Sequence, residues 1–227
     1  SCTASGSWDG SKSFSGSEDF SFDQPGNKSF TLTCQNSEGT SSSKTVSANV
    51  LDNLNGIVVG INYLDSANVI LDLNSNYLED DGEPSSISSE GNFILPDDNE
   101  DIISFGGTDT VSGIDFSSVT LSSKAYSSSI NQKVVSSITS FDYENTGTIS
   151  SSDLLSLSND IDIYIENPIV AAFDNAANDS IYNKYFEVNS QLFLLTYGTQ
   201  LYVNEKYDNS LDSRIFYQQL YQSIFDE

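Results

Sequence analysis

Residues 72–83 place oxygen-bearing side chains at the spacing of a calcium-binding loop. With Asp72 as the first position, side-chain oxygens fall at positions 1, 3, 5, 9 and 12, and a backbone carbonyl is available at position 7. Calcium takes about six to eight hard oxygen ligands, and a glutamate at the last position can bind with both of its oxygens. The predicted ligands are Asp72, Asn74, Asn76, the Leu78 carbonyl, Asp80 and Glu83.

The sixth position of this loop departs from the usual pattern, because it holds Tyr77 where a glycine normally makes the sharp turn. We therefore expect a strained or altered loop that binds calcium less well. The alternative is a solvated Asx turn between two strands, with exposed carboxylates. We favour calcium because the other positions match and the sequence has no lysine or arginine between Lys44 and Lys124.

A second, weaker candidate loop has the same spacing, with Gly147 at its sixth position. Its predicted ligands are Asp142, Glu144, Thr146, Thr148, Ser150 and Asp153. It lacks strong ligands at its fifth and ninth positions and ends in aspartate instead of glutamate. The favoured interpretation is therefore a helix start, in which Ser150 or Ser151 caps a helix that begins at Ser152.

The charges of the chain are strongly unbalanced, with 33 acidic residues against 8 basic ones and a formal net charge of -25. An acidic run at residues 97–101 is typical of a solvated turn; the alternative is that it shares a calcium site with the Asp72 loop. Such a surface repels phosphate backbones and anionic lipids. No run approaches the roughly 18 apolar residues of a spanning helix. We expect no nucleic-acid binding and no membrane insertion.

The residue types that are missing exclude several kinds of catalysis. Without histidine, the chain has no Ser-His-Asp or Cys-His catalysis and no histidine-bound zinc. Two cysteines and no methionine leave almost no soft ligands, so a bound metal should have oxygen ligands. No GxSxG elbow, phosphate-binding loop or dinucleotide fingerprint occurs. A glycosidase pair of carboxylates is the weakest alternative, since acids this abundant form accidental pairs. We expect a protein that is not an enzyme.

The elements that must position these residues change along the chain. Alternating apolar and polar residues predict strands at residues 29–34 and 43–50, and strand-like runs between turns predict further strands at residues 57–63, 67–73, 92–95, 102–105 and 119–121. Apolar residues at three- and four-residue steps predict helices at residues 179–202 and 210–225, which would form an αα-hairpin. Shorter helices are expected at residues 152–158 and after Pro168. Asp226 and Glu227 oppose a helix dipole, so we expect the natural chain to continue.

The N-terminal fifty residues contain both cysteines, Cys2 and Cys34, and in a secreted chain we expect these to form a disulfide. The stretches CTASGSWDGSKSFSGSE and SFTLTCQNSEGTSSSKTVSANV resemble the Ig-like repeats of large bacterial surface proteins, with Phe30 where those repeats carry Tyr. The resemblance implies an Ig-like domain at residues 1–50 that lacks its first strands. Unless the sequence starts mid-domain, those strands would come from a preceding segment or, by β-strand donation, from a neighbouring subunit.

The segment that contains the first calcium loop carries a second resemblance. GINYLDSANVILDLNSNYLEDDGEPSSISSEGNFIL resembles the calcium-binding B-type repeats of serine-aspartate adhesins and related carboxypeptidase-regulatory-like modules. The following GGTDTVSGIDFSSVTLSS resembles a stretch that comes after such modules in bacterial surface proteins. The resemblance implies an extracellular, calcium-stiffened β-sandwich with no catalytic residues to carry over.

The expected fold is mainly β with an α C-terminal part. It comprises a partial Ig-like sandwich at residues 1–50, a calcium-binding β-sandwich at 51–130 and a helical region at 131–227. The expected function is that of a calcium-stabilised structural or adhesive segment of an extracellular bacterial surface protein or filament. Its expected partners are neighbouring copies or domains of the same surface protein, with a glycan or cell-surface receptor as a further expected partner. The alternative is a carbohydrate-binding adhesive module, in which Trp8 or Tyr77 stacks on sugars.

Overall fold

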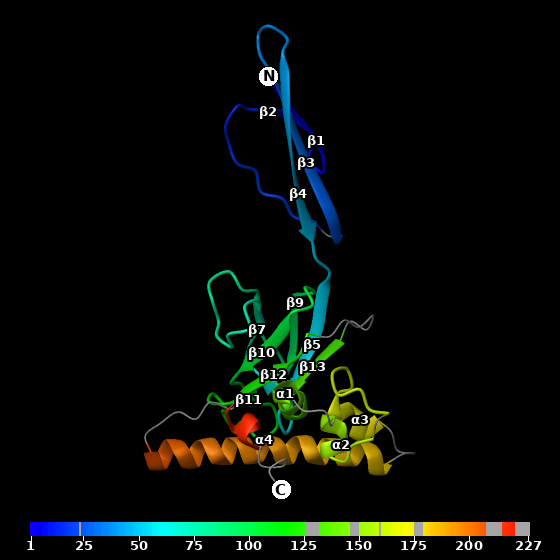
Figure 1. Cartoon of the computed structure of the whole chain (residues 1–227), viewed down its shortest axis with the longest axis vertical. Coiled ribbons are helices and arrows are strands. Elements are labelled where there is room, and N and C mark those ends of the chain that lie inside the picture. Colours follow the sequence, from blue (N-terminus) through cyan, green and yellow to red (C-terminus); the bar gives the residue numbers. More distant parts are fainter. Residues whose placement is uncertain are drawn as a thin grey trace. The chain divides into compact units, whose positions relative to one another are not determined.

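The computed structural model describes residues 1–22, 24–125, 132–145, 150–158, 160–174, 179–207 and 215–220 (Figure 1). The chain forms two compact units, Ser1–Asp52 and Asn53–Glu227. Among the described residues, strand residues outnumber helical residues, so the prediction of a mainly β protein with a C-terminal helical region is confirmed. The boundary expected after residue 130 does not separate two compact units, because the residues on both of its sides belong to the second one.

Unit 1 is an open, antiparallel sheet of four strands with the order β2-β1-β3-β4 in its described residues. The strands are β1 (Cys2–Gly6), β2 (Gly10–Lys12), β3 (Gly26–Gln35) and β4 (Ser41–Val50). The predicted disulfide between Cys2 and Cys34 is confirmed, and these residues lie directly opposite each other on β1 and β3. An Ig-like bridge joins two packed sheets, whereas this one joins neighbouring strands of a single sheet.

The two faces of the unit 1 sheet differ in character because its strands alternate with a period of two. Phe30 lies opposite Val46 and Leu32 opposite Lys44, so one face is largely apolar. On the other face threonines face each other, and the hydroxyl oxygens of Thr31 and Thr45 are 2.7 Å apart. Among the apolar side chains described in unit 1, only Cys2 and Ala4 are buried. The apolar face is therefore only partly covered by the described residues.

Unit 2 is built on a curved sheet of seven strands with the order β8-β7-β10-β12-β13-β5-β9 in the part of the chain described. The strands are β5 (Asn53–Val59), β7 (Asn68–Asp72), β8 (Ser85–Ile87), β9 (Asn92–Pro96), β10 (Asp101–Phe105), β12 (Thr120–Ser123) and β13 (Gln132–Ser136). A short pair, β6 (Leu64–Asp65) and β11 (Thr108–Asp109), lies beside it. Only β13 and β5 pair in parallel among these described strands. The outer strands approach each other, since the Ile94 amide on β9 donates to Ser86 Oγ on β8 at 3.4 Å. The sheet is thus nearly closed around its core.

The helices of unit 2 are α1 (Ser137–Glu144), α2 (Ser151–Leu154), α3 (Pro168–Asp174) and α4 (Asp179–Tyr207), and residues 215–220 are also helical. Helix α4 confirms the long helix predicted from residue 179, and α3 begins at Pro168 as expected. In Figure 1, α4 crosses beneath the sheet. None of the described helices has both the length and the apolar character needed to cross a membrane.

The helices share their core with the sheet. Phe193 of α4 is fully buried in the same cluster as Leu71, Phe93 and Leu121, and its ring meets Phe116 edge to face at 4.8 Å. A Cβ atom on Gly60 would lie 2.8 Å from the Phe193 ring, so a larger residue there would push the helix away. Asn189 of α4 also donates to the Gly60 carbonyl at 2.8 Å. Helix α4 is therefore part of the β domain and not of a separate helical one.

Candidate metal centre

The predicted calcium loop connects β7 to β8, and Asp72 is the last residue of β7. The Asp72 side chain is fully buried. Its carboxylate accepts two backbone amides of the loop, from Asn76 at 3.1 Å and from Tyr77 at 2.8 Å. Because a buried carboxylate needs such donors, Asp72 fixes the path of the first half of the loop.

Three further predicted ligands converge on one point. The side-chain amides of Asn74 and Asn76 both donate to Asp80 Oδ2, at 2.8 and 2.5 Å. These bonds, with that of Asn74 the larger influence, lower the pKa of Asp80. The side chains at positions 3, 5 and 9 therefore turn toward the same space, where Asn74 and Asn76 present amide nitrogens to Asp80, so both amide groups would have to rotate for their oxygens to bind a cation there.

Backbone amides close the rest of the loop. Asn74 Oδ1 accepts from the Asn76 amide at 3.1 Å, and Asn76 Oδ1 accepts from the Leu78 amide at 2.7 Å. Glu83 accepts from the amides of Leu73 and Asp80 at 2.9 and 3.1 Å. The first two bonds are Asx turns, the local structure of the alternative interpretation. Each accepting oxygen keeps a second lone pair, so these turns and a cation are compatible.

Tyr77 adopts the backbone conformation that its position in the loop requires of a glycine. Its φ angle is 64°, in the left-handed region. A residue with a Cβ atom pays about 1–2 kcal/mol for this conformation. The Asp72 carboxylate holds its amide, and its ring meets Tyr143 of α1 edge to face at 5.3 Å. The sixth position therefore has the left-handed backbone that strains a residue other than glycine, and Asp72 within the loop and Tyr143 outside it contact Tyr77 in this conformation.

The donor set suits calcium in kind, since it consists of carboxylate, amide and carbonyl oxygens. The described residues nevertheless contain no group of three or more His, Cys, Asp and Glu side chains close enough to hold a metal. Among the predicted ligands, the carboxylates of Asp72 and Glu83 accept backbone amides, and that of Asp80 accepts the side-chain amides of Asn74 and Asn76. Calcium would thus depend on Asn74, Asn76 and the Leu78 carbonyl and would draw the carboxylates inward.

The acidic run at residues 97–101 reaches the loop through one residue. Asp101 lies directly opposite Asp72 in the pairing of β10 with β7, whereas residues 97–100 are exposed. Asp101 accepts from the Ala125 amide and from the Tyr143 hydroxyl, both at 2.6 Å. Burial and the bond to Asp101 raise the pKa of Tyr143, which therefore remains a donor. Two carboxylates opposite each other repel, and a nearby cation would relieve that repulsion.

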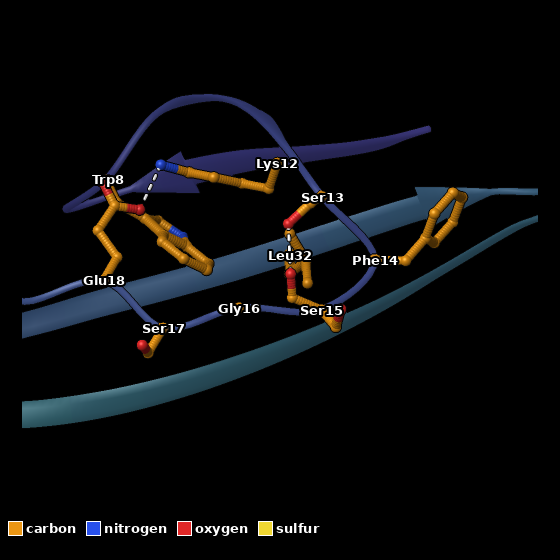
Figure 2. Close-up of a pocket in the computed structure, with 9 residues that line it drawn as sticks. All are labelled: Trp8, Lys12, Ser13, Phe14, Ser15, Gly16, Ser17, Glu18 and Leu32. Carbon is orange, nitrogen blue, oxygen red and sulfur yellow. Dashed lines mark hydrogen bonds and ion pairs between the residues drawn. The ribbon is translucent and has the colours of Figure 1, made fainter.

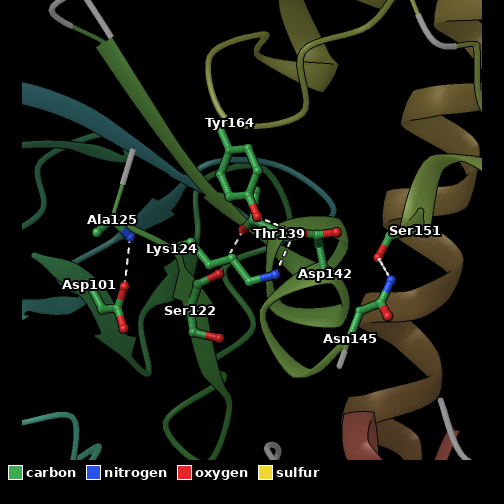
Figure 3. Close-up of polar contacts among 9 residues, drawn as sticks. All are labelled: Asp101, Ser122, Lys124, Ala125, Thr139, Asp142, Asn145, Ser151 and Tyr164. Carbon is green, nitrogen blue, oxygen red and sulfur yellow. Dashed lines mark hydrogen bonds and ion pairs between the residues drawn. The ribbon is translucent and has the colours of Figure 1, made fainter. Parts of the chain in front are cut away.

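The second predicted loop is only partly described, because Thr146, Gly147 and Thr148 lie outside the described residues. Asp142 binds Lys124 Nζ at 3.0 Å and accepts from the Tyr164 hydroxyl, as Figure 3 shows. Burial alone would raise the pKa of Asp142, but hydrogen bonds from Tyr164 and Ser151 and the charge of Lys124 lower it.

At the end of that loop, Ser150 caps α2, with its hydroxyl accepting from the Asp153 amide at 3.1 Å. The described residues thus show the helix start that was the favoured interpretation. Asp142, the proposed first ligand, is already engaged by a lysine and a tyrosine.

The aromatic residues proposed to stack on sugars are both engaged within the chain. Trp8 is half-buried, donates to the Thr31 carbonyl at 3.1 Å and has Lys12 Nζ 5.1 Å from its ring centroid. Figure 2 shows the Lys12–Glu18 ion pair beside this ring, at a cavity of about 180 Å³. Tyr77 is also half-buried, against α1. Neither side chain presents a fully exposed ring.

Comparisons with protein-family models, curated proteins and solved structures find no match to this chain. The residues around the loop that sequence reasoning missed are Tyr143 and Gln218. Tyr143 supports Tyr77 and Asp101, and Gln218 binds Glu144 next to them. These residues lie far from the loop in the sequence and follow no ligand spacing. The sequence could therefore indicate only that the segments carrying them are helical, and not that they lie near the loop.

Proposed function

We propose that residues 53–227 form a calcium-stabilised, non-catalytic structural module of an extracellular bacterial surface protein or filament. The observation that carries the proposal is the loop at residues 72–83, in which three side chains at ligand positions converge and Tyr77 takes the left-handed conformation expected at position 6. Calcium at this loop would tie the end of β7 to the start of β8 and stiffen one edge of the sheet.

The charge of unit 2 gives calcium a second role. Residues 53–227 contain 27 acidic residues against 5 basic ones. Self-repulsion of this size opposes a compact state. An ion that binds only the folded chain stabilises it in proportion to RT ln(1 + [ion]/Kd). A rigid module that holds its shape only in calcium-rich surroundings suits an extracellular spacer.

A melting experiment on the full chain tests the calcium role. We expect the melting temperature of unit 2 to be about 4–8 °C higher in 2 mM calcium than in excess chelator. This rise corresponds to about 2 kcal/mol of stabilisation, because 1 kcal/mol shifts the melting temperature of a domain of this size by about 2–4 °C. Asp80→Asn, which alters a ligand position, should lose most of this gain. Asp81→Asn, its exposed neighbour off the ligand spacing, should keep it. Equal melting with calcium and with chelator would overturn the proposal.

We also propose that unit 1 assembles with neighbouring copies through its open sheet. Strand β4 lies at an edge of the sheet, pairs with β3 over ten residues and is exposed from Ser41 to Asn49. Long, regular edge strands offer unpaired backbone groups to another chain. Beside this edge, Phe30, Leu32 and Val46 line an apolar cavity of about 410 Å³. Strand addition from a second copy would pair this edge, and packing of that copy against the apolar face would cover Val46.

A further inference from the structure

Glu144, the last residue of α1, links the loop to the C-terminal helical residues. Its side chain is largely buried, and its two carboxylate oxygens bind different parts of the chain. Oε1 accepts from the Tyr77 hydroxyl at 3.4 Å, and Oε2 accepts from Gln218 Nε2 at 2.8 Å. A single buried carboxylate therefore joins the sixth position of the loop to residues 215–220.

Each side of this link is supported by packing. On the loop side, the Tyr77 ring lies against Tyr143, the neighbour of Glu144 on α1. On the C-terminal side, Tyr217 is fully buried in a cluster with Ile138 and Phe141 of α1. Helix α1 thus lies between the loop and residues 215–220. A shift of the Tyr77 side chain would lengthen or break its hydrogen bond to Glu144.

The backbone of Tyr77 is controlled by a predicted calcium ligand. Asp72 Oδ2 accepts the Tyr77 amide at 2.8 Å and helps to hold its φ angle at 64°. A loop without its ion can relax this strained conformation, whereas an ion on Asp72 and on the Leu78 carbonyl fixes the residues on both sides of Tyr77. An ion bound at these two ligands would therefore favour the present position of the Tyr77 ring and hydroxyl.

From these contacts we infer that calcium binding at residues 72–83 is coupled, through Tyr77 and Glu144, to the docking of residues 215–220 on α1. The inference rests on the proposed calcium function and adds its regulation. The ion favours the docked segment, and the docked segment favours the ion. Because such coupling is reciprocal for binding equilibria, loss of docking must weaken calcium binding by the same factor that calcium strengthens docking.

The test uses two adjacent glutamines of the full chain. Gln218→Ala removes the bond to Glu144, and Gln219→Ala is the matched control, because Gln219 is equally exposed and has no contact with Glu144 among those described. Calorimetric titration should give an affinity for calcium about fivefold weaker in Gln218→Ala than in the wild type, at the low end of typical couplings. Gln219→Ala should bind calcium like the wild type.

Hydrogen exchange of the wild type gives a second readout that needs no variant. Calcium should slow amide exchange in residues 215–220 by about fivefold. If calcium binds but neither this exchange rate nor the affinity of Gln218→Ala changes, the coupling is overturned and the calcium function stands. If the wild type does not bind calcium, the calcium function is overturned and the coupling with it.

Discussion

The polar network around Asp142 shows how single residues stabilise unit 2. This carboxylate is mostly buried, with 19% of its side chain exposed, and receives the Lys124 ammonium and the Tyr164 hydroxyl. These donors, with Ser151, outweigh burial and lower its pKa. A lowered pKa means that the folded state favours the charged carboxylate. The stability that Asp142 contributes is fully present above the pKa that its carboxyl has in the unfolded state. It is lost as the pH falls through the lower pKa that this carboxyl has in the folded state.

The Tyr164→Phe variant tests whether the Tyr164 hydroxyl lowers the pKa of Asp142 and stabilises the fold. Removing the hydroxyl should raise the pKa of Asp142 and cost about 1.5–3 kcal/mol of unfolding free energy at pH 7, the net contribution of a hydrogen bond to a charged group. The difference from the wild type should shrink below the pKa of Asp142, where both carboxyls are protonated. NMR titration of the Asp142 carboxyl and urea unfolding at pH 7 and pH 3 measure both effects. Tyr182→Phe, which removes the hydroxyl of a half-buried tyrosine on α4, should not move this pKa; if it does, the assignment to Tyr164 fails.

The two aspartates Asp72 and Asp142 show what the sequence can predict about a site. The partners of Asp72 are amides of the next few residues, so its loop follows from local spacing. The partners of Asp142, Lys124 and Tyr164, come from a strand end and a loop that only the tertiary fold brings to α1. The local turns at residues 72–83 were therefore predictable, whereas their contacts with Tyr143 and Glu144 were not.

Among the elements, β4 is the one whose exposure most needs an explanation. Val46 on its apolar face is 60% exposed, and its neighbour Ser47 points to the hydroxyl-rich face. In a monomer neither side chain is buried. If a second copy covers the apolar face, a charged side chain at position 46 would be buried away from water, which costs free energy. A charged side chain at position 47, on the opposite face, would remain in water.

The Val46→Lys variant tests assembly at the level of this element. We expect sedimentation at increasing protein concentration to show association of the wild type and about a tenfold weaker association of the variant, the effect of a charge facing an apolar contact. Ser47→Lys, on the opposite face of the same strand, should associate like the wild type. A wild type that stays monomeric, or two lysine variants with the same behaviour, would refute assembly through this face.

Sequence patterns predicted most helices and strands, but they did not predict that the sheet and the helices after residue 53 form one compact unit. Alternation in residues 29–34 and 43–50 identified β3 and β4, and helical spacing identified α4, because both signals are local. The strand β13 fell inside the region expected to be helical. Its partner β5 lies about eighty residues earlier, so its pairing depends on a contact that no local pattern records. For the same reason the shared core of sheet and helices was not predicted.

At the scale of the whole unit, the core joins helix and sheet into one cooperative structure. Phe193 of α4 has no exposed surface, whereas the adjacent Leu194 is 51% exposed. The ring of Phe193 fills space among strand residues and lies against Gly60. Loss of this ring would leave a cavity inside the sheet and not merely loosen a helix.

The Phe193→Ala variant tests this cooperativity. It should lower the unfolding free energy of unit 2 by about 3–5 kcal/mol, the usual cost of removing a buried phenyl ring. Leu194→Ala should change it by less than about 0.5 kcal/mol. Circular dichroism should show the strand and helix signals of unit 2 lost in one transition that shifts only in Phe193→Ala. Helix loss at a lower temperature than sheet loss would show that the two are separate units.

Because β13 lies far from β5 in the sequence, we expect this parallel pair to form later in folding than the pair of β5 with β9. Residues 53–59 can meet their antiparallel partner β9 early, but the sheet reaches its final strand order only when residues 132–136 arrive from far along the chain. Contacts this distant in sequence are slow to form. The loop at residues 72–83 is local and can close well before that event. If the loop binds calcium as proposed, the ion would hold β7 and β8 together before the remaining strands pair.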